Sequence, residues 1–251
     1  MNLNNSGLIA FTALFLWILS ERMSYAQISI DLEAGMVTTG YNDVRIPGDA
    51  GTFISFSDEL SSDPKFFTRI RAGYRLGQRG EVLLLFAPLR FTYTGAVDRD
   101  IFFQGETYPA ASPLTATYKF NSYRATYRYY VLEREKIDIG LGLTIKARDA
   151  LIGIEGGGLE SQKTDFGFVP LINFVVHWQP TERFGLLLDG DALAAPSGRA
   201  EDVLVAFTYQ ANENFLLKAG YRILEGGADN RTVYTFSMFH YGAIGVIYRF
   251  K

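Results

Sequence analysis

From residue 28 onward, hydrophobic and polar side chains alternate with a period of two. In the segment ISIDLEAGM, residues 28–36, every second residue is apolar, and two acidic residues stand between the apolar ones. The same alternation runs through FFTRIRAGYRL, residues 66–76, and IDIGLGLTIKAR, residues 137–148. A period of two places successive side chains on opposite faces of a β-strand. The pattern therefore predicts strands with two different faces.

Ten such segments follow one another along the chain, at residues 28–41, 66–77, 81–95, 115–131, 137–150, 166–179, 184–194, 202–210, 215–226 and 232–250. Their connections alternate in length. Four are short polar turns, with the sequences GQRG, LEREK, QPTER and ANEN, and the others are generally longer loops, at residues 42–65, 96–114, 151–165, 195–201 and 227–231. Short turns at one end and longer loops at the other are typical of a transmembrane barrel. We predict an all-β fold, a closed antiparallel up-and-down transmembrane β-barrel of about ten strands, with eight or twelve as alternatives.

Aromatic residues gather near both ends of these segments. At the short-turn ends stand Tyr74, Tyr129, Trp178, Phe184, Tyr209, Phe215, Tyr248 and Phe250. Towards the other ends stand Phe91, Tyr93, Phe168, Tyr221, Tyr234 and Phe236. Two aromatic belts mark the two membrane interfaces of such a barrel. Alternation looks the same in a soluble sheet, so a β-sandwich or a lipocalin-like barrel stays open as an alternative.

Composition removes several classes of function. The 251 residues include 24 basic and 27 acidic ones, and the net charge of -3 implies no broad basic surface for nucleic acid. Cysteine is absent, which excludes disulfides and thiolate metal sites. The 25 glycines suit strands and turns better than helices. We expect no cofactor and no metal site.

The N-terminal residues predict export. Residues 7–19, GLIAFTALFLWIL, form an apolar run too short to cross a membrane as a helix, and SYA at residues 24–26 places small residues at a cleavage site. We predict a cleaved signal peptide at residues 1–26 and a barrel domain at residues 27–251.

The last strand carries a family resemblance. In IGVIYRF, residues 244–250, the side chains of Ile244, Val246, Tyr248 and Phe250 share one face. This strand resembles the C-terminal signature of bacterial outer-membrane β-barrel proteins, by which the barrel-assembly machinery recognises them. The resemblance implies an outer-membrane location, contact with outer-membrane lipid, and the assembly machinery as a partner.

Charged residues fill the row opposite to the apolar one. We predict an interior charge network of Glu33, Arg69, Arg71, Arg90, Arg124, Arg128, Arg148, Asp189, Asp191, Asp202, Arg222 and Glu225. The same row also carries Asp31, Arg75, Asp138, Lys146 and Lys218. Ten strands enclose a narrow interior, in which charges persist only when they are paired. The first interpretation is a barrel filled by side chains with a structural or surface-interaction role, and the alternatives are a narrow pore or an enzyme.

Catalytic motifs are sparse. The sequence LDGDAL, with Asp189 and Asp191, is similar to the paired acids of the omptin proteases, which act near the outer rim of a ten-stranded barrel, but no Asp-x-His companion accompanies it. We assign no catalytic residue, and an enzyme acting on lipid or peptide at the outer rim stays an alternative. The longer loops, such as GYNDVRIPGD at residues 40–49, are explained by turn chemistry, with recognition of an unknown surface ligand as the other possibility.

Overall fold

The computed structural model describes residues 28–196 and 198–250, which contain strands and loops only. The predicted signal peptide lies outside the described residues. No helix in the described part of the chain is long and apolar enough to span a membrane. The strands are β1 (Ile28–Arg45), β2 (Ile54–Ser55), β3 (Lys65–Leu76), β4 (Gly80–Ala87), β5 (Arg90–Gly95), β6 (Ile101–Phe103), β7 (Glu106–Tyr108), β8 (Leu114–Arg134), β9 (Ile137–Gly156), β10 (Leu159–Trp178), β11 (Phe184–Ala195), β12 (Gly198–Gln210), β13 (Phe215–Asp229) and β14 (Tyr234–Arg249).

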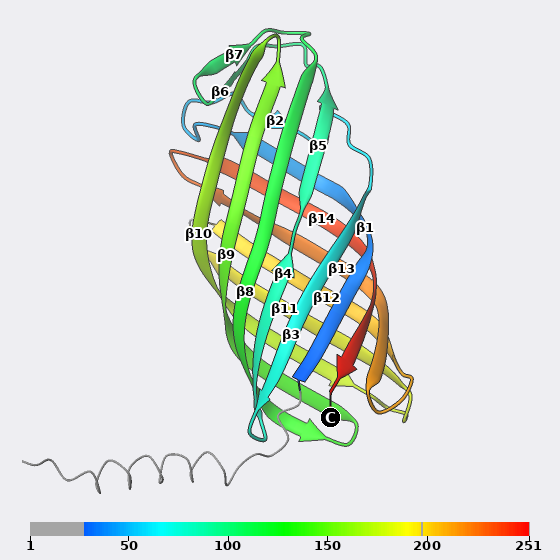
Figure 1. Ribbon diagram of the computed structural model, residues 1–251. Helices are drawn as coiled ribbons and strands as arrows, with labels where there is room; N and C mark the ends of the chain where they lie inside the picture. The colour runs from blue at the N-terminus through cyan, green and yellow to red at the C-terminus, as the bar shows by residue number, and fades with distance from the viewer. Residues whose placement is uncertain (1–27, 197, 251) are drawn as a thin grey trace, which may run out of the picture.

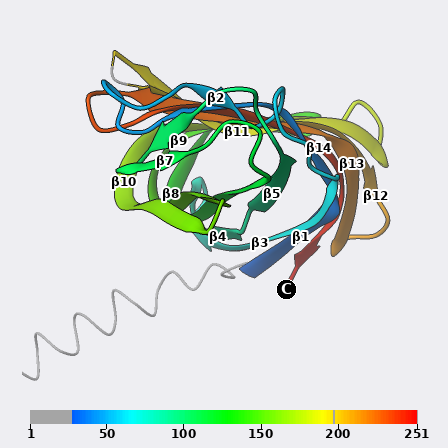
Figure 2. The ribbon, with the colours of Figure 1, turned by 90° about the horizontal axis from the view of Figure 1, so that it is seen from above.

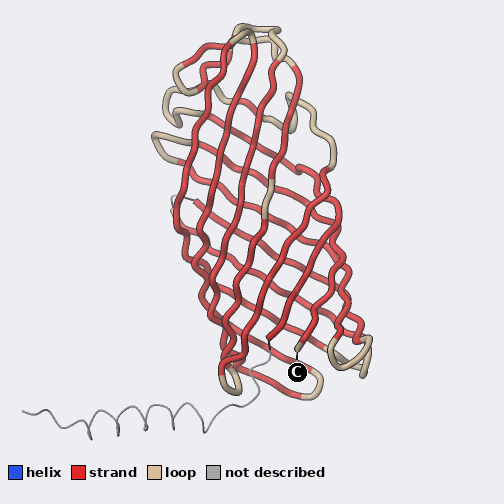
Figure 3. Tube along the Cα trace, in the orientation of Figure 1, coloured by secondary structure: helices blue, strands red, loops and turns tan. Residues whose placement is uncertain are grey.

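These strands form a closed antiparallel barrel of ten strands (Figure 1). β14 closes the sheet by pairing with β1 from Ser29↔Arg249 to Arg45↔Tyr234. β4 and β5 form one pass through the wall, because both pair with β8 and only two residues separate them (Figure 3). The predicted closed barrel and its strand number are therefore confirmed.

The two ends of the barrel differ as the connections predict. At one end, called the turn end here, lie the four short turns, the start of β1 and the end of β14. At the other, called the loop end, residues 46–64 carry β2 and residues 96–113 carry the β6–β7 hairpin (Figure 2).

The expected loop at residues 151–165 is instead strand. β9 and β10 continue upward and are joined by Gly157 and Gly158 alone. Both glycines have positive φ, of 60° and 80°, which a two-residue hairpin turn of type I′ requires. β8, β9 and β10 therefore rise above the rest of the wall (Figure 1).

Near the turn end, the apolar residues of the alternating pattern lie on the outer surface of the barrel. On β8 the outward residues Tyr123, Tyr127 and Tyr129 are exposed, while Arg124 and Arg128 between them are buried inside the barrel. This is the arrangement of a wall surrounded by lipid.

Near the loop end, the polarity inverts. On β5 the residues Arg90, Thr92 and Thr94 face outward and are exposed, whereas Phe91 and Tyr93 are fully buried. We call the buried apolar cluster at this level the outer core; it includes Ile46, Ile54, Phe56, Phe91, Tyr93, Ile101, Phe103, Tyr108, Tyr118, Ile154 and Phe239. An apolar interior with a polar outside is the pattern of a sheet in water. Phe91 and Tyr93, which we expected in an outward aromatic belt, therefore belong to the outer core.

A β-bulge in β1 explains one outward polar residue. The register of β1 against β14 shifts between Thr39 and Tyr41, at Gly40. The ring of His240 lies over this glycine, where a Cβ atom would stand 2.4 Å from Nε2 of His240. His240 also lies 2.5 Å from the hydroxyl of Tyr221, measured from Nδ1. Its position in the outward row thus coincides with a bulge.

One part of the barrel wall is incomplete. β10 pairs with β9 along its whole length, from Leu159 to Trp178, but with β11 only from Ile172 to Trp178. The first half of β10 therefore has one unpaired edge at the loop end.

Candidate functional site in the barrel interior

The side chains in the middle of the barrel form an ion network around two carboxylates, Asp202 of β12 and Glu33 of β1. Asp202 accepts hydrogen bonds from Arg69 at 2.8 Å and Arg222 at 2.5 Å, and Nη2 of Arg124 lies 2.6 Å from its Oδ2. Glu33 accepts a bidentate pair of hydrogen bonds from Arg222, at 2.8 and 2.9 Å, and a third hydrogen bond from Lys218 at 3.0 Å. All these side chains are buried, and Arg222 is only 2% exposed.

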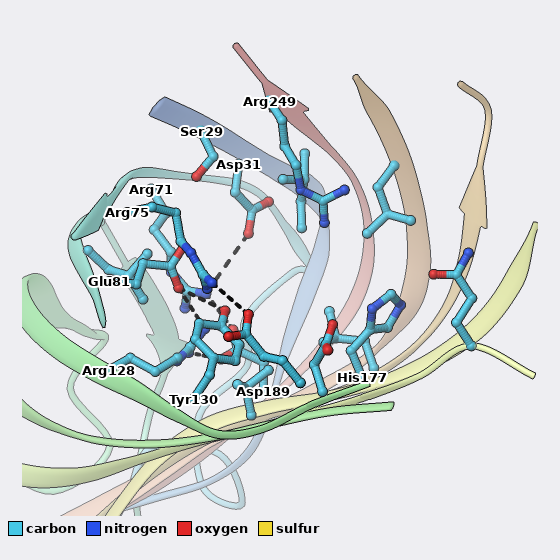
Figure 4. A pocket seen from close by; sticks show the side chains of 18 of the residues that line it. Ser29, Asp31, Arg71, Arg75, Glu81, Arg128, Tyr130, His177, Asp189 and Arg249 are labelled. Atoms are coloured by element: carbon cyan, nitrogen blue, oxygen red, sulfur yellow. Dashed lines mark hydrogen bonds and ion pairs between the residues drawn. The ribbon is translucent and has the colours of Figure 1, made fainter. Parts of the chain in front are cut away.

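A second group of ion pairs lies nearer the turn end, around Asp189 of β11 (Figure 4). Its carboxylate accepts from Arg71 and, at 2.6 Å, from Arg128. Nη1 of Arg128 also lies 3.6 Å from the carboxylate of Glu81. Asp31 joins this group to the first, because Arg71 lies 4.0 Å from Asp31, and Lys218 lies 2.8 Å from Asp31 and 3.0 Å from Glu33.

Asp191 extends the network to strands β9 and β10. It accepts hydrogen bonds from Arg124 at 2.7 Å, Thr144 at 2.6 Å and Asn173 at 2.8 Å. Nine of the ten barrel strands thus contribute a side chain to the network, and β14 is the exception among them. An arrangement of this kind ties opposite walls together through charge-assisted bonds.

Above the network, aromatic rings from β3, β5, β8 and β14 pack against one another inside the barrel. Phe67 and Tyr241 meet edge to face with centroids 4.8 Å apart. Phe239 stacks on Phe91 at 5.2 Å and lies 5.5 Å from Tyr118. These rings form the floor of the outer core, which lies directly over the ion network.

Below the network, a polar cavity of about 450 Å³ opens at the turn end (Figure 4). Its lining includes Asp31, Arg71, Arg128 and Asp189 of the network and, nearer the mouth, Arg249. Nε2 of His177 lies in this cavity, 3.0 Å from the hydroxyl of Thr208. Among residues 28–196 and 198–250, no group of three or more ligating side chains could hold a metal ion.

The structure brings most of the predicted interior residues together. Those in the network are Glu33, Arg69, Arg71, Arg124, Arg128, Asp189, Asp191, Asp202 and Arg222. Three expectations require correction. Arg90 lies on the outward face of β5 and is exposed, because the wall faces water at that level. Arg148 lies apart from the network and pairs with Asp165 of the adjacent strand.

Glu225 is the third correction. It follows the inward-facing Leu224 in a strand of continuous register and so lies on the outward face of β13. Nε of Arg199 donates hydrogen bonds to both carboxylate oxygens of Glu225, at 2.8 and 2.9 Å, and the Tyr41 hydroxyl donates a further one. The guanidinium of Arg199 in turn lies 4.9 Å from the centre of the Phe236 ring. Glu225 therefore belongs to a surface cluster near the loop end.

Sequence reasoning missed Glu81, Thr144 and Asn173 as members of the network. Glu81 lies near the start of β4, whose two faces are both largely apolar, so the sequence did not show which face points inward. Thr144 and Asn173 are uncharged, and a search for charges passes over them. Thr144 lies two residues before Lys146, and Asn173 lies two residues before Val175, so each shares the inward face of its strand with that neighbour. This position in the alternation was the available signal.

The four residues of the expected assembly signal lie in one outward row of β14 and just after it. Ile244 is 66% and Phe250 44% exposed. The Tyr248 ring contacts those of Phe215 and Phe250, with centroids 4.7 and 4.6 Å away. The backbone N–H of Phe250 donates to the carbonyl of Ile28 at 2.8 Å, so this residue also takes part in closing the barrel.

Comparison with known proteins identifies the fold. No protein-family model and no curated protein sequence matches the chain. Among solved structures, the outer membrane protease OmpT from Escherichia coli has 11% sequence identity and a TM-score of 0.54, over 92% of this chain and 100% of that one. Ail, the attachment invasion locus protein of Yersinia pestis in complex with a heparin analogue, has 13% identity and a TM-score of 0.43, over 90% and 99% of the two chains. Neisserial surface protein A has 16% identity and a TM-score of 0.38, over 89% and 97%.

At these identities the likeness concerns the fold. Together with the closed ladder and the outward apolar band, the likeness to OmpT defines the fold class, a closed antiparallel β-barrel of the kind that spans bacterial outer membranes. Within that class this chain is a ten-stranded barrel whose wall continues beyond the apolar band at its loop end.

Proposed function

We propose that the protein is a closed outer-membrane barrel with a structural and surface-interaction role. The observation that carries this proposal is the stacking of two layers of buried interior side chains, the ion network and the outer core. A chain of paired charges beneath a tightly packed aromatic layer leaves the cavity at the turn end blind. The polar outward face at the loop end then presents the barrel to the cell exterior.

Export and assembly belong to the same proposal. A signal peptide at residues 1–26 would direct the chain across the inner membrane. The outward row of Ile244, Val246, Tyr248 and Phe250 would engage the barrel-assembly machinery, and the outward apolar band would contact outer-membrane lipid. The exposure of Ile244 and Phe250 supports this role.

The pore and enzyme alternatives are less well supported. Arg69 and Arg71, which a pore would use to conduct ions, are bound to Asp202 and Asp189. Asp189 and Asp191, the acids of the protease-like motif, are each 3% exposed and hold guanidinium groups in the middle of the barrel. Neither acid is available to a substrate at the rim.

Conductance and stability measured together test the proposal. Purified protein is inserted in planar bilayers, and the unfolding midpoint of Asp191→Asn is compared with that of the natural protein. We expect no steady conductance and a lowered midpoint, because removing one carboxylate leaves the guanidinium of Arg124 uncompensated. Steady channels together with an unchanged midpoint would refute the closed scaffold and favour the pore.

A further inference from the structure

The unpaired edge of β10 is defined by the direction of its backbone groups. The N–H of Gln179 donates to the carbonyl of Lys136 at 2.8 Å, so odd-numbered residues of this strand direct their backbone polar groups towards β9. In a regular strand, even-numbered residues then point to the opposite side, towards β11. The ladder with β11 runs from Trp178↔Leu186 to Ile172↔Ala192. The next even-numbered residue of β10, which would have to continue the hydrogen bonds to β11, is Pro170.

Proline ends this ladder because it has no N–H to donate. Beyond Pro170, the backbone groups of Phe168, Phe166, Thr164 and Gln162 point in the same direction, and β10 has no strand partner on that side in the described part of the chain. We call these four residues the β10 edge. Such a row of free donors and acceptors is a template for another strand.

Beside the β10 edge the outward face of the strand is open, and the inward face is covered at Ser161, whose hydroxyl bonds to Tyr108 and to the carbonyl of Phe103 in the β6–β7 hairpin. No residue from 160 to 170 is buried, although Ile152 and Ile154 on the adjacent β9 are. Even the inward-facing side chain of Asp165 is 51% exposed. Near Asp165, space beside the edge is therefore accessible from the interior side as well as from outside.

The edge opens at the outer membrane interface. Trp178 and Phe168 both face outward and are exposed, with fractions of 47% and 70%. Ten residues of strand span about 33 Å, and a tilt of about 40° turns this into about 25 Å of depth, the height of the apolar band of such barrels. Phe168 thus marks the outer limit of hydrocarbon, and an unpaired edge is tolerated only beyond it.

We propose that the β10 edge binds an extended peptide segment of a partner protein, which adds to the sheet as a further strand. Backbone bonds supply the affinity in this mode of recognition, and alternate side chains supply the specificity. On the outward side the added strand continues the row of Phe166 and Phe168, so it carries apolar residues there. On the inward side it meets Lys163 and Asp165, so it carries an acidic residue opposite the first and a basic one opposite the second.

A second copy of this chain does not fit the edge. Two barrels in one membrane share their orientation, and a two-fold axis along the membrane normal relates them. Their β10 strands, each tilted by about 40°, then cross at about 80° and cannot form a ladder. The occupant is therefore a peptide that is free to align with β10. The inference deepens the surface-interaction role proposed above and rests on it.

The probe is a labelled peptide of sequence Val-Thr-Val-Lys-Val-Glu-Thr, designed to run antiparallel to residues 162–168. Binding to the full-length barrel in lipid nanodiscs is followed by fluorescence anisotropy. A peptide of the same composition in the order Val-Val-Val-Thr-Thr-Lys-Glu lacks the alternation and is the peptide control. We expect the first peptide to bind and the second to bind at least about tenfold more weakly.

Thr164→Pro and Thr164→Ala are the matched variants. The proline removes one edge N–H without touching the β9 ladder, as Pro170 already does in the natural chain, and the alanine keeps that N–H. We expect binding to be at least about tenfold weaker in Thr164→Pro and unchanged in Thr164→Ala. Equal binding by both variants, or no binding to the natural protein, overturns the proposal.

Amide hydrogen exchange of the natural protein gives a reading that needs no variant. The bound peptide should slow exchange at Thr164, Phe166 and Phe168, and protection found only elsewhere overturns the assignment. If Thr164→Pro does not fold, this measurement and Gln162→Pro decide. If the peptide does not bind and the protein does not conduct in bilayers, peptide binding at the β10 edge is rejected and the closed scaffold is retained. Steady conductance in bilayers together with an unchanged unfolding midpoint of Asp191→Asn would instead reject the closed scaffold.

Discussion

At the scale of single residues, Asp202 shows how the interior charges depend on one another. Its two carboxylate oxygens lie within 2.8 Å of nitrogen atoms of three arginines, Arg69, Arg124 and Arg222. Each of these arginines comes from a different strand, and all are buried. Loss of this one negative charge leaves three neighbouring cations with less compensation.

Asp202→Asn should therefore be strongly destabilising. We expect a loss of about 3–5 kcal/mol, the cost of leaving a buried charge without its partner. Asp165→Asn is the matched control, because Asp165 also binds an arginine but its side chain is 51% exposed, and its loss should cost no more than about 1 kcal/mol. Urea unfolding of both variants, followed by heat-modifiable gel migration, makes the comparison. Equal losses would contradict the importance assigned to the buried network.

The Glu59–Arg99 pair joins the two long connections at the loop end and should make them sensitive to pH. Arg99 donates to the Glu59 carboxylate at 2.9 Å and to the carbonyl of Phe53 at 2.8 Å. The hydrogen bonds from Arg99 hold the pKa of the Glu59 carboxyl below its usual range. A lowered pKa in the folded state stabilises the fold above the usual carboxyl pKa, and this contribution disappears as the pH falls through the lowered value.

Glu59→Gln should accordingly be less stable than the natural protein at pH 7, and the difference should be smaller at about pH 3, below the usual carboxyl range. Unfolding midpoints of the two proteins at both pH values provide the test. A difference that stays constant with pH would show that the carboxylate charge contributes nothing.

At the scale of elements, the last strand should control assembly. We expect Phe250→Ala, or deletion of residues 249–251, to reduce folded barrel in the membrane and increase degraded periplasmic material, because the outward aromatic row is lost. Removal of Lys251 alone is the control and should be neutral or favourable. Membrane fractionation with immunoblotting gives the amounts. Normal membrane levels of both damaged proteins would reject an assembly role for this row.

The strands were predictable because their alternation is a local property. A period of two identifies a strand and its two faces from neighbouring residues alone. It does not say which face is inside, and charge was used to decide. That choice is right for Arg69 and Arg124, where lipid lies outside the wall, and wrong for Arg90 and Glu225, where water does.

The pairing of the interior charges was beyond the sequence for a different reason. Arg69 binds a carboxylate 133 residues away, and Arg222 binds one 189 residues away. Such partners face each other only once the barrel has closed with a particular stagger between its strands. A single sequence shows on which face of its strand each side chain lies, but not how far neighbouring strands are shifted relative to one another. The residues of the network were therefore predictable, whereas the bonds between them were not.

At the scale of the whole molecule, the inversion of polarity fixes the position of the membrane. Phe168→Trp, made in a Trp178→Phe background, should place an indole at the outer interface, with blue-shifted emission quenched by brominated lipid. Arg90→Trp in the same background should emit at longer wavelength and escape quenching, because Arg90 faces water beyond the apolar band. Equal quenching at both positions would contradict the boundary drawn between the two levels of the wall.

The outer core also determines how the barrel responds to temperature. Its buried rings pack against one another above the hydrocarbon, so unfolding transfers them to water, whereas the outward band can stay in lipid. Exposure of apolar surface to water raises the heat capacity, and the stability that such burial provides weakens on cooling. The paired charges below do not depend on this effect. Cooling should therefore loosen the protruding half of the barrel while the membrane-spanning half stays intact.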